Sequence, residues 1–211
     1  MIDQETPNRK PPCFPVRFKM IQAPEFAKLA PCTAVVLLDT CYRLHRWQPK
    51  HRAMGDFSCC DEQWAARLAM SPSSFRDGRR ELKHLGWINH CPGANKPRPR
   101  SSSYPPAAFA FSIPAYGRIS YAVWEALLEA LRQGAVTHSD VTCVAVLAYL
   151  WRNCGGETLG QVQVPKAAFS NTGRSIKALR HAVDSLANTL PGVLSASFGN
   201  KFVAFSCRFA S

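Results

Sequence analysis

The segment from Ser71 to Leu85 carries side chains suited to recognition through hydrogen bonds and charge. Ser71 can cap exposed N–H groups, Pro72 suits a first helical position, and Gly86 follows the last turn, so the sequence predicts a helix here. A guanidinium donates two parallel hydrogen bonds to a planar pair of acceptors, so arginine is the sharpest recognition group on such a helix. The candidate contact residues of this segment are Ser73, Ser74, Arg76, Asp77, Arg79, Arg80 and Lys83.

The other side of this helix is apolar and indicates how the helix is held. Phe75, Leu82 and Leu85 recur at helical spacing and are expected to be buried, with Gly78 at a close contact. The segment therefore predicts an amphipathic helix with one face on a core and the other in solvent.

Two expected strands and a basic loop follow this helix. The strands are predicted at 87–91 and 109–113, and the Pro- and Gly-broken loop covers 92–103. The loop adds three cations to the candidate contact residues, namely Lys96, Arg98 and Arg100.

A second helix of the same kind begins after Ser175, which can cap it. Its apolar set is Ile176, Leu179, Ala182, Val183 and Leu186. A β-hairpin is expected over 192–209, turning at Gly199 and Asn200, where a tight turn needs positive φ. The candidate contact residues of this region are Arg174, Lys177, Arg180, His181 and Lys201.

Both halves of the chain repeat one order of elements: helix, short strand, short helix, turn, capped helix and two strands. In the first half, helices are expected over 33–47 and 61–69, with a short strand or turn at 55–58. In the second half, helices are expected over 120–133, 139–153 (capped by Ser139) and 165–170, a strand over 161–164 and a turn over 171–173.

The two capped segments resemble tandem winged helix-turn-helix proteins. The resemblance is carried by MSPSSFRDGRRELKHLGWI, Met70 to Ile88, and more loosely by TGRSIKALRHAVDSLANTLPGVL, Thr172 to Leu194. It implies an α+β fold with two winged helix-turn-helix domains in tandem, mostly helical with small β-hairpin wings. The expected division is a flexible, basic, Pro-rich arm over 1–20, domain 1 over 21–113 and domain 2 over 114–211.

The resemblance also implies a way of binding double-stranded DNA. The second helix of such a motif enters the major groove, and its N-terminal residues reach base edges. A bidentate arginine on guanine discriminates by about 1–3 kcal/mol, so Arg76 and Arg180 are the foremost base-contacting candidates. The basic loop is expected to follow phosphates or reach the minor groove. Hydroxyls of Ser71 and Ser175 could bond a phosphate, although capping explains both serines equally well.

Composition is consistent with an anionic partner. The chain has 211 residues, 46% apolar and 19% charged, with a net charge of +12. These values exclude a disordered polybasic tail, and no apolar run reaches the roughly 18 residues of a membrane span. The start of the chain is not expected to be a signal peptide. Residues 1–100 carry +8 and 101–211 carry +4, so the first half is the expected DNA-contacting unit, whereas the second is open to protein docking or dimerisation.

Catalytic and metal chemistry find little support in the sequence. Nine cysteines occur without a C-x-x-C pair, which indicates small buried thiols in a reducing cytoplasm; a zinc site built from scattered Cys and His is the alternative. No P-loop, G-x-S-x-G, H-E-x-x-H or G-x-G-x-x-G is present, and the six His are scattered. The sequence therefore predicts no enzyme, cofactor or metal.

The predicted function is sequence-specific binding of double-stranded DNA in the cytoplasm. In architecture the chain is similar to plasmid and phage replication initiators, and a transcriptional regulator is equally compatible. The alternative is a non-catalytic subunit of a larger nucleoprotein assembly that uses its winged helices for docking. A homodimer or other protein subunits are further candidate partners, a membrane is not, and RNA is less favoured because no stacking sheet is evident.

Overall fold

The computed structural model describes residues 13–17, 21, 24–46, 61–90, 102–103, 116–154, 156, 160–170 and 174–208. The first half contains β1 (Cys13–Arg17), α2 (Pro24–Lys28), α3 (Pro31–Arg46), α4 (Asp61–Arg67), α5 (Pro72–His84), β2 (Asn89–His90) and β3 (Ser102–Ser103). The second half contains β4 (Tyr116–Ser120), α6 (Tyr121–Arg132), α7 (His138–Asn153), β5 (Val162–Pro165), α9 (Lys166–Ser170), α10 (Ile176–Thr189), β6 (Leu194–Phe198) and β7 (Phe202–Cys207). The predicted α+β class, mostly helical with small antiparallel sheets, is confirmed.

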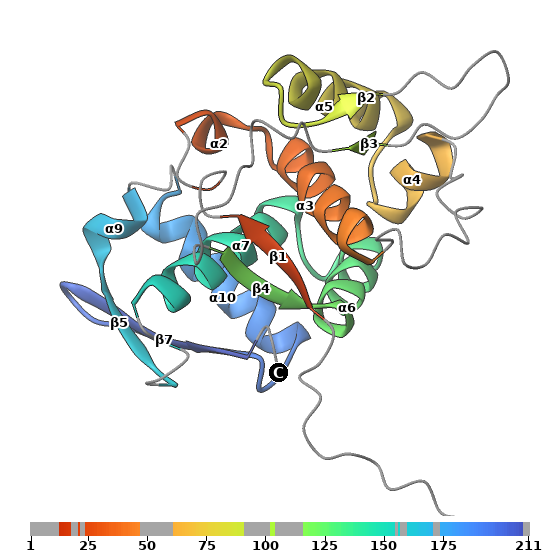
Figure 1. Cartoon of the computed structure of the whole chain (residues 1–211). Coiled ribbons are helices and arrows are strands. Elements are labelled where there is room, and N and C mark those ends of the chain that lie inside the picture. The colour runs from red at the N-terminus through yellow and green to blue at the C-terminus, as the bar shows by residue number, and fades with distance from the viewer. Residues whose placement is uncertain are drawn as a thin grey trace, which may run out of the picture.

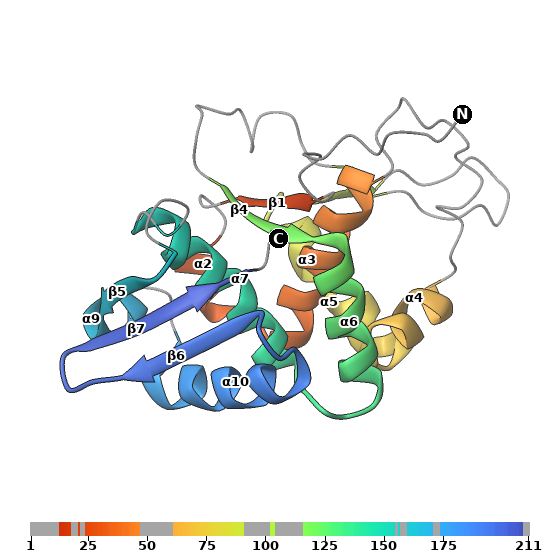
Figure 2. The same cartoon turned by 90° about the horizontal axis from the view of Figure 1, so that it is seen from below.

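Two sets of helices flank a shared centre, as Figures 1 and 2 show from two directions. Helices α3 and α7 pack against each other in the middle. We call α3, α4, α5 and the β2–β3 pair the first unit, and α7, α9, α10 and the β5-β7-β6 sheet the second unit. Helix α6 and the antiparallel pair β1–β4 lie between them. None of the helices in the described ranges combines the length and apolar content needed to cross a membrane.

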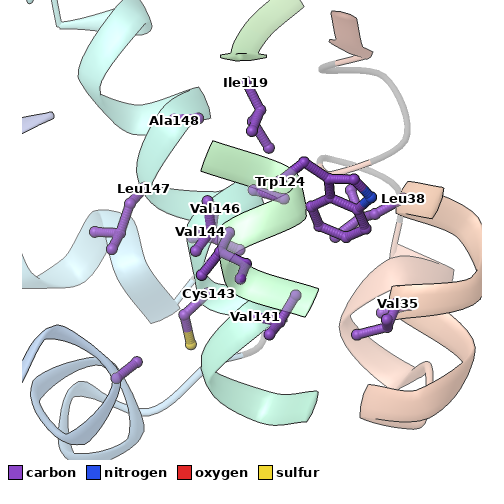
Figure 3. Packing of buried hydrophobic residues seen from close by; sticks show 14 of the residues in the cluster. Val35, Leu38, Ile119, Trp124, Val141, Cys143, Val144, Val146, Leu147 and Ala148 are labelled. Atoms are coloured by element: carbon purple, nitrogen blue, oxygen red, sulfur yellow. The ribbon is translucent and has the colours of Figure 1, made fainter. Parts of the chain in front are cut away.

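The core runs continuously through both units. Figure 3 shows Leu38 of α3, Trp124 of α6 and Ile119 of β4 converging beside the apolar face of α7. Trp124 and Ile119 are fully buried, and α7 is buried along its length from Val141 to Leu150. A helix that is apolar all round belongs inside a protein, which explains why α7 occupies the centre.

The predicted ends of α5 are confirmed. The Ser71 hydroxyl accepts a hydrogen bond from the backbone N–H of Ser74 at 3.1 Å, and Pro72 is the first helical residue. After the C-cap, Gly86 takes φ +69°, a left-handed conformation in which glycine has no Cβ penalty. Ser120 caps α6 and Ser175 caps α10 in the same way.

The cap of α7 differs from the prediction. Thr137, rather than Ser139, precedes the helix and accepts from the N–H of Asp140 at 3.3 Å. The Asp140 carboxylate accepts in return from the N–H of Thr137 at 2.9 Å. This reciprocal capping box satisfies two helix-end donors at once, which a cap at Ser139 could not do with this Asp.

The N-terminal arm also differs from the prediction, because residues 13–17 form β1. Strand β1 pairs with β4 in antiparallel register, from Cys13 opposite Ser120 to Arg17 opposite Tyr116. The Phe14 ring is fully buried and packs edge-on against Tyr42 and Trp124. This part of the predicted flexible arm is therefore a structural strand, and the rest of the arm lies outside the described residues.

The two hairpins confirm the predicted order but correct its details. Strand β2 pairs with Ser102–Ser103, inside the expected loop, whereas the expected strand at 109–113 lies outside the described residues, as do 55–58 and 171–173. The β6–β7 hairpin turns at Gly199 as predicted, closed by its N–H donating to the Phe202 carbonyl at 3.0 Å. No residue of that turn has positive φ, so the expected left-handed conformation is wrong there.

Candidate functional site

Helix α5 presents most of its predicted contact residues to solvent. The exposed ones are Ser73, Ser74, Arg76, Asp77, Arg80 and Lys83. Hydroxyls of Ser73 and Ser74 lie 2.8 and 2.9 Å from the Ser71 hydroxyl at the start of the helix. Arg80 donates to Asp77 one turn earlier at 3.0 Å, an exposed pair that water and salt weaken. The face therefore carries hydrogen-bonding groups and cations with little apolar surface.

The buried side of α5 explains how that face is positioned. A Cβ at Gly78 would lie 3.2 Å from the Thr33 hydroxyl oxygen and 3.3 Å from its Cα, so glycine permits the close approach of α5 to α3. The Thr33 hydroxyl donates to the Glu81 carboxylate at 2.9 Å. The Phe75 ring packs on Trp64 of α4, with ring centroids 5.1 Å apart. The predicted close contact at Gly78 is confirmed.

Arg79 is held inside the first unit. Its side chain is 10% exposed, and Nη1 lies 2.6 Å from Oδ1 of Asp61 on α4. The guanidinium carbon also lies 5.5 Å from the Phe75 ring centroid. This placement contradicts the prediction that Arg79 contacts DNA. Its position between Phe75 and Leu82 on one helical face explains the burial, because residues three and four apart share a face.

The cations of the first-unit loop, Lys96, Arg98 and Arg100, lie outside the described residues. Their contribution to a binding surface stays a prediction from the sequence.

In the second unit, α10 exposes Lys177, Arg180 and His181. The Arg180 guanidinium lies over the Phe198 ring at the end of β6, 4.8 Å from its centroid. This cation–π contact connects the helix to the hairpin while leaving the Arg180 residue exposed. His181 Nδ1 lies 3.2 Å from Oδ1 of Asp140, whose other carboxylate oxygen accepts from the N–H of Thr137 in the α7 capping box.

Arg174 is less accessible than predicted. Two of its guanidinium nitrogens, Nε and Nη2, are buried without a hydrogen-bond partner among the described residues. The group lies near the Cys143 thiol of α7. Burial raises the pKa of Cys143 to about 12, an effect that the nearby Arg174 charge reduces. Arg174 is therefore half-buried, and its role as a contact residue stays a prediction.

The tip of the β6–β7 hairpin combines charge with an exposed aromatic ring. Lys201 is exposed there, as predicted, and Phe202 beside it is 47% exposed. The backbone N–H of Lys166, the first residue of α9, donates to the Lys201 carbonyl at 3.0 Å. Sequence reasoning missed Phe202 and Lys166, since only the strand pairing brings them together.

Charge in the second unit is more concentrated than the total for residues 101–211 indicates. Residues 160–208, which include β5, α9, α10 and the β6–β7 hairpin, contain six Lys and Arg against one Asp. The remaining acidic residues of that half are Glu125, Glu129, Asp140 and Glu157. The local net charge of +5 therefore equals that of residues 71–100, which changes the expectation that the first unit alone contacts DNA.

A buried carboxylate joins the first unit to α6. Asp39 of α3 is fully buried and accepts from the indole N–H of Trp64 at 2.6 Å and from that of Trp124 at 3.0 Å. Arg43 Nε donates to it at 2.7 Å. Because Trp64 belongs to α4 and Trp124 to α6, one side chain fixes three helices. Sequence reasoning did not single out Asp39.

Metal ligation finds no support in the part of the chain that the structure describes. No group of three His, Cys, Asp or Glu side chains lies close enough there to hold an ion. Among the described cysteines, Cys41, Cys143 and Cys207 are buried. Burial raises the pKa of Cys207 as well, so its thiol stays protonated at neutral pH.

Comparison with protein-family models, with curated proteins and with solved structures gave no match to this chain.

Proposed function

We propose that the chain binds double-stranded DNA through two winged helix-turn-helix units, with α5 and α10 as the helices that enter the major groove. The proposed roles are sequence-specific binding in plasmid- or phage-type replication initiation, or in transcriptional regulation. The foremost base-contacting residues are Arg76 on α5 and Arg180 on α10.

One observation carries this proposal: the connectivity of the second unit. Strand β5 pairs with β7, β7 pairs with β6, and the helices α9 and α10 lie between β5 and β6 in the chain. This order, with a helix before the first strand and a hairpin after the last helix, is typical of winged helices. Figure 2 shows α10 lying along the hairpin, so helix and hairpin can meet the same partner. The six cations against one acid in this part of the chain suit a polyanion.

The first unit supports the same proposal in part. Its helices α4 and α5 and the short β2–β3 pair follow in the same order as α9, α10 and the β6–β7 hairpin. Helix α5 is capped in solvent and turns an outward face of serines and arginines away from α3. Exposed arginines at the start of a capped helix are suitably placed to reach base edges.

Selection from a random pool of duplexes tests the proposal. A sequence-specific binder enriches one motif, and Arg76→Ala should relax one position of that motif by about 1–3 kcal/mol of discrimination. The matched control is Lys28→Ala, which removes an equal charge from an exposed site on α2 and should leave every position unchanged.

Two outcomes would contradict the proposal. If wild-type protein binds no duplex at low salt, the DNA-binding function is wrong and the docking alternative gains. If binding occurs but no motif is enriched, the protein binds DNA through its backbone phosphates only. The docking alternative finds little support on the described surface, where Phe202 is the one large hydrophobic residue that is exposed.

A further inference from the structure

The exposed ring of Phe202 has no structural role that the fold requires. In β7 the buried residues alternate with exposed or half-buried ones: Val203 and Phe205 face the core, whereas Phe202 faces solvent. An aromatic ring at the end of a hairpin, outside the core, contributes little to folding stability. Its position is therefore better explained by contact with a partner.

The charges around Phe202 indicate the chemistry of that partner. Lys201 directly precedes Phe202, and Pro165, its cross-strand neighbour in β5, directly precedes Lys166. Residues 160–170 and 190–208 contain no Asp or Glu. Lys201 and Lys166 therefore stand opposite each other, one position nearer the tip than Phe202. An apolar ring beside two lysines, without a nearby acid, suits a polyanion with apolar surfaces inside it, which is the character of stacked nucleic-acid bases.

The location of the hairpin tip fits the same partner. Figure 2 shows the tip beside α9, at the end of the sheet where α10 begins. Lys177 and Arg180 lie in the first half of α10, and Arg180 contacts Phe198 of the hairpin. With α10 in a major groove, the hairpin would lie against the adjacent minor groove, as a wing does.

We propose that the β6–β7 hairpin enters the minor groove and that Phe202 wedges between two base pairs, partly unstacking them and bending the duplex. This inference rests on the proposed DNA-binding function. Lys201 and Lys166 would neutralise phosphates beside the opened step. Steps of a pyrimidine followed by a purine should be preferred, because they unstack most easily.

Bending measured by energy transfer tests the wedge. The probe is the duplex enriched from the random pool, with a donor dye at one end and an acceptor at the other; a mixed-sequence duplex at low salt replaces it if no motif is enriched. Wild-type protein should bend the probe by about 20–90°. Phe202→Ala should remove most of that bend and weaken binding about tenfold, the loss of one aromatic–base stack.

Two further variants separate the wedge from other effects. Phe202→Leu keeps an apolar wedge and should retain most of the bend. Gln163→Ala removes an exposed side chain from the same face of the sheet, two residue pairs away, and should behave as wild type. Circular dichroism checks that all variants fold. We expect them to fold, because Phe202 and Gln163 are both exposed.

The outcomes distinguish this inference from the proposed function. If wild-type protein binds without bending, or if Phe202→Ala bends the probe fully, the wedge is wrong while DNA binding stands. If wild type binds no duplex, both are wrong. If Phe202→Ala instead changes the oligomeric state in sedimentation and leaves the bend intact, the hairpin tip is a protein contact and the wedge is overturned.

Discussion

The two units hold their outward helices by different means. Helix α5 adds polar contacts with its neighbours, Arg79 to Asp61 and Thr33 to Glu81, to the apolar packing of its buried Phe75 and Leu82. Helix α10 is fixed mainly by apolar side chains, with Leu179, Ala182, Val183 and Leu186 buried. Hydrogen bonds and ion pairs require particular atoms, whereas apolar packing tolerates swaps of similar volume. The position of α5 should therefore depend on single charges, and that of α10 on total volume.

The largest effect is expected at Asp39, which joins the first unit to α6. Asp39→Asn leaves Arg43 without its buried counter-charge and cannot accept from every donor that converges there. Removing one partner of a buried pair costs about 3–5 kcal/mol, and we expect a loss of that size in urea unfolding. Asp77→Asn, at the exposed pair on α5, should cost less than about 1 kcal/mol. Equal losses in the free energy of unfolding for the two variants would show that Asp39 does not hold the first unit against α6.

The next effect distinguishes two neighbouring arginines of α5. Arg79→Ala should lower the free energy of unfolding by about 3 kcal/mol, because the half-buried Asp61 loses its buried partner. Arg80→Ala, at an exposed pair, should change it by about 0.5 kcal/mol or less. DNA affinity should fall more for Arg80→Ala than for Arg79→Ala. A weaker unfolding effect at Arg79 than at Arg80 would contradict the polar positioning of α5.

Base discrimination then tests whether both units contact bases. Arg180→Ala should relax one position of the selected motif by about 1–3 kcal/mol, at a different position from the one relaxed by Arg76→Ala. If only Arg76→Ala alters the motif, the second unit binds the backbone or a protein, despite its local charge. Because Arg180 packs on Phe198, unfolding should be measured in parallel to separate lost packing from lost contact.

The smallest effect is expected in the salt dependence of binding. Lys177 is exposed near the start of α10 and is a candidate phosphate contact. Lys177→Ala should reduce the slope of log K against log salt by about 0.9 and weaken all sequences alike. Lys28→Ala on α2 is the matched control and should leave the slope unchanged. An unchanged slope for Lys177→Ala would place that lysine away from the duplex.

Local signals in the sequence predicted the parts of the fold that depend on near neighbours. The ends of α5 follow from Ser71, Pro72 and Gly86, and the β6–β7 hairpin from its turn residues. The capping box of α7 was also present in the sequence as Thr137 and Asp140, but Ser139 stood between them as a competing cap. Strand β1 escaped prediction because its partner β4 lies far along the chain.

The candidate site was predictable where helical periodicity alone decides exposure. Arg76 and Arg80 face solvent as that periodicity implies. Arg79 could have been assigned to the buried side from its spacing to Phe75 and Leu82, because a long cation can be buried when an acid on another helix meets it. The exposure of Phe202 depends on the strand register, which composition and local spacing do not determine.

The contact between Asp39 and Trp124 has a consequence for the order in which the protein is made. These residues are 85 positions apart, and Phe14 likewise packs on Trp124 across the β1–β4 pair. During synthesis from the N-terminus, the first unit cannot complete its core until α6 has left the ribosome. A chain that stops at residue 113 would carry an exposed Phe14 ring, and its Asp39 would lack the hydrogen bond from the indole N–H of Trp124. Such a fragment should depend on chaperones, although it contains every helix of the first unit.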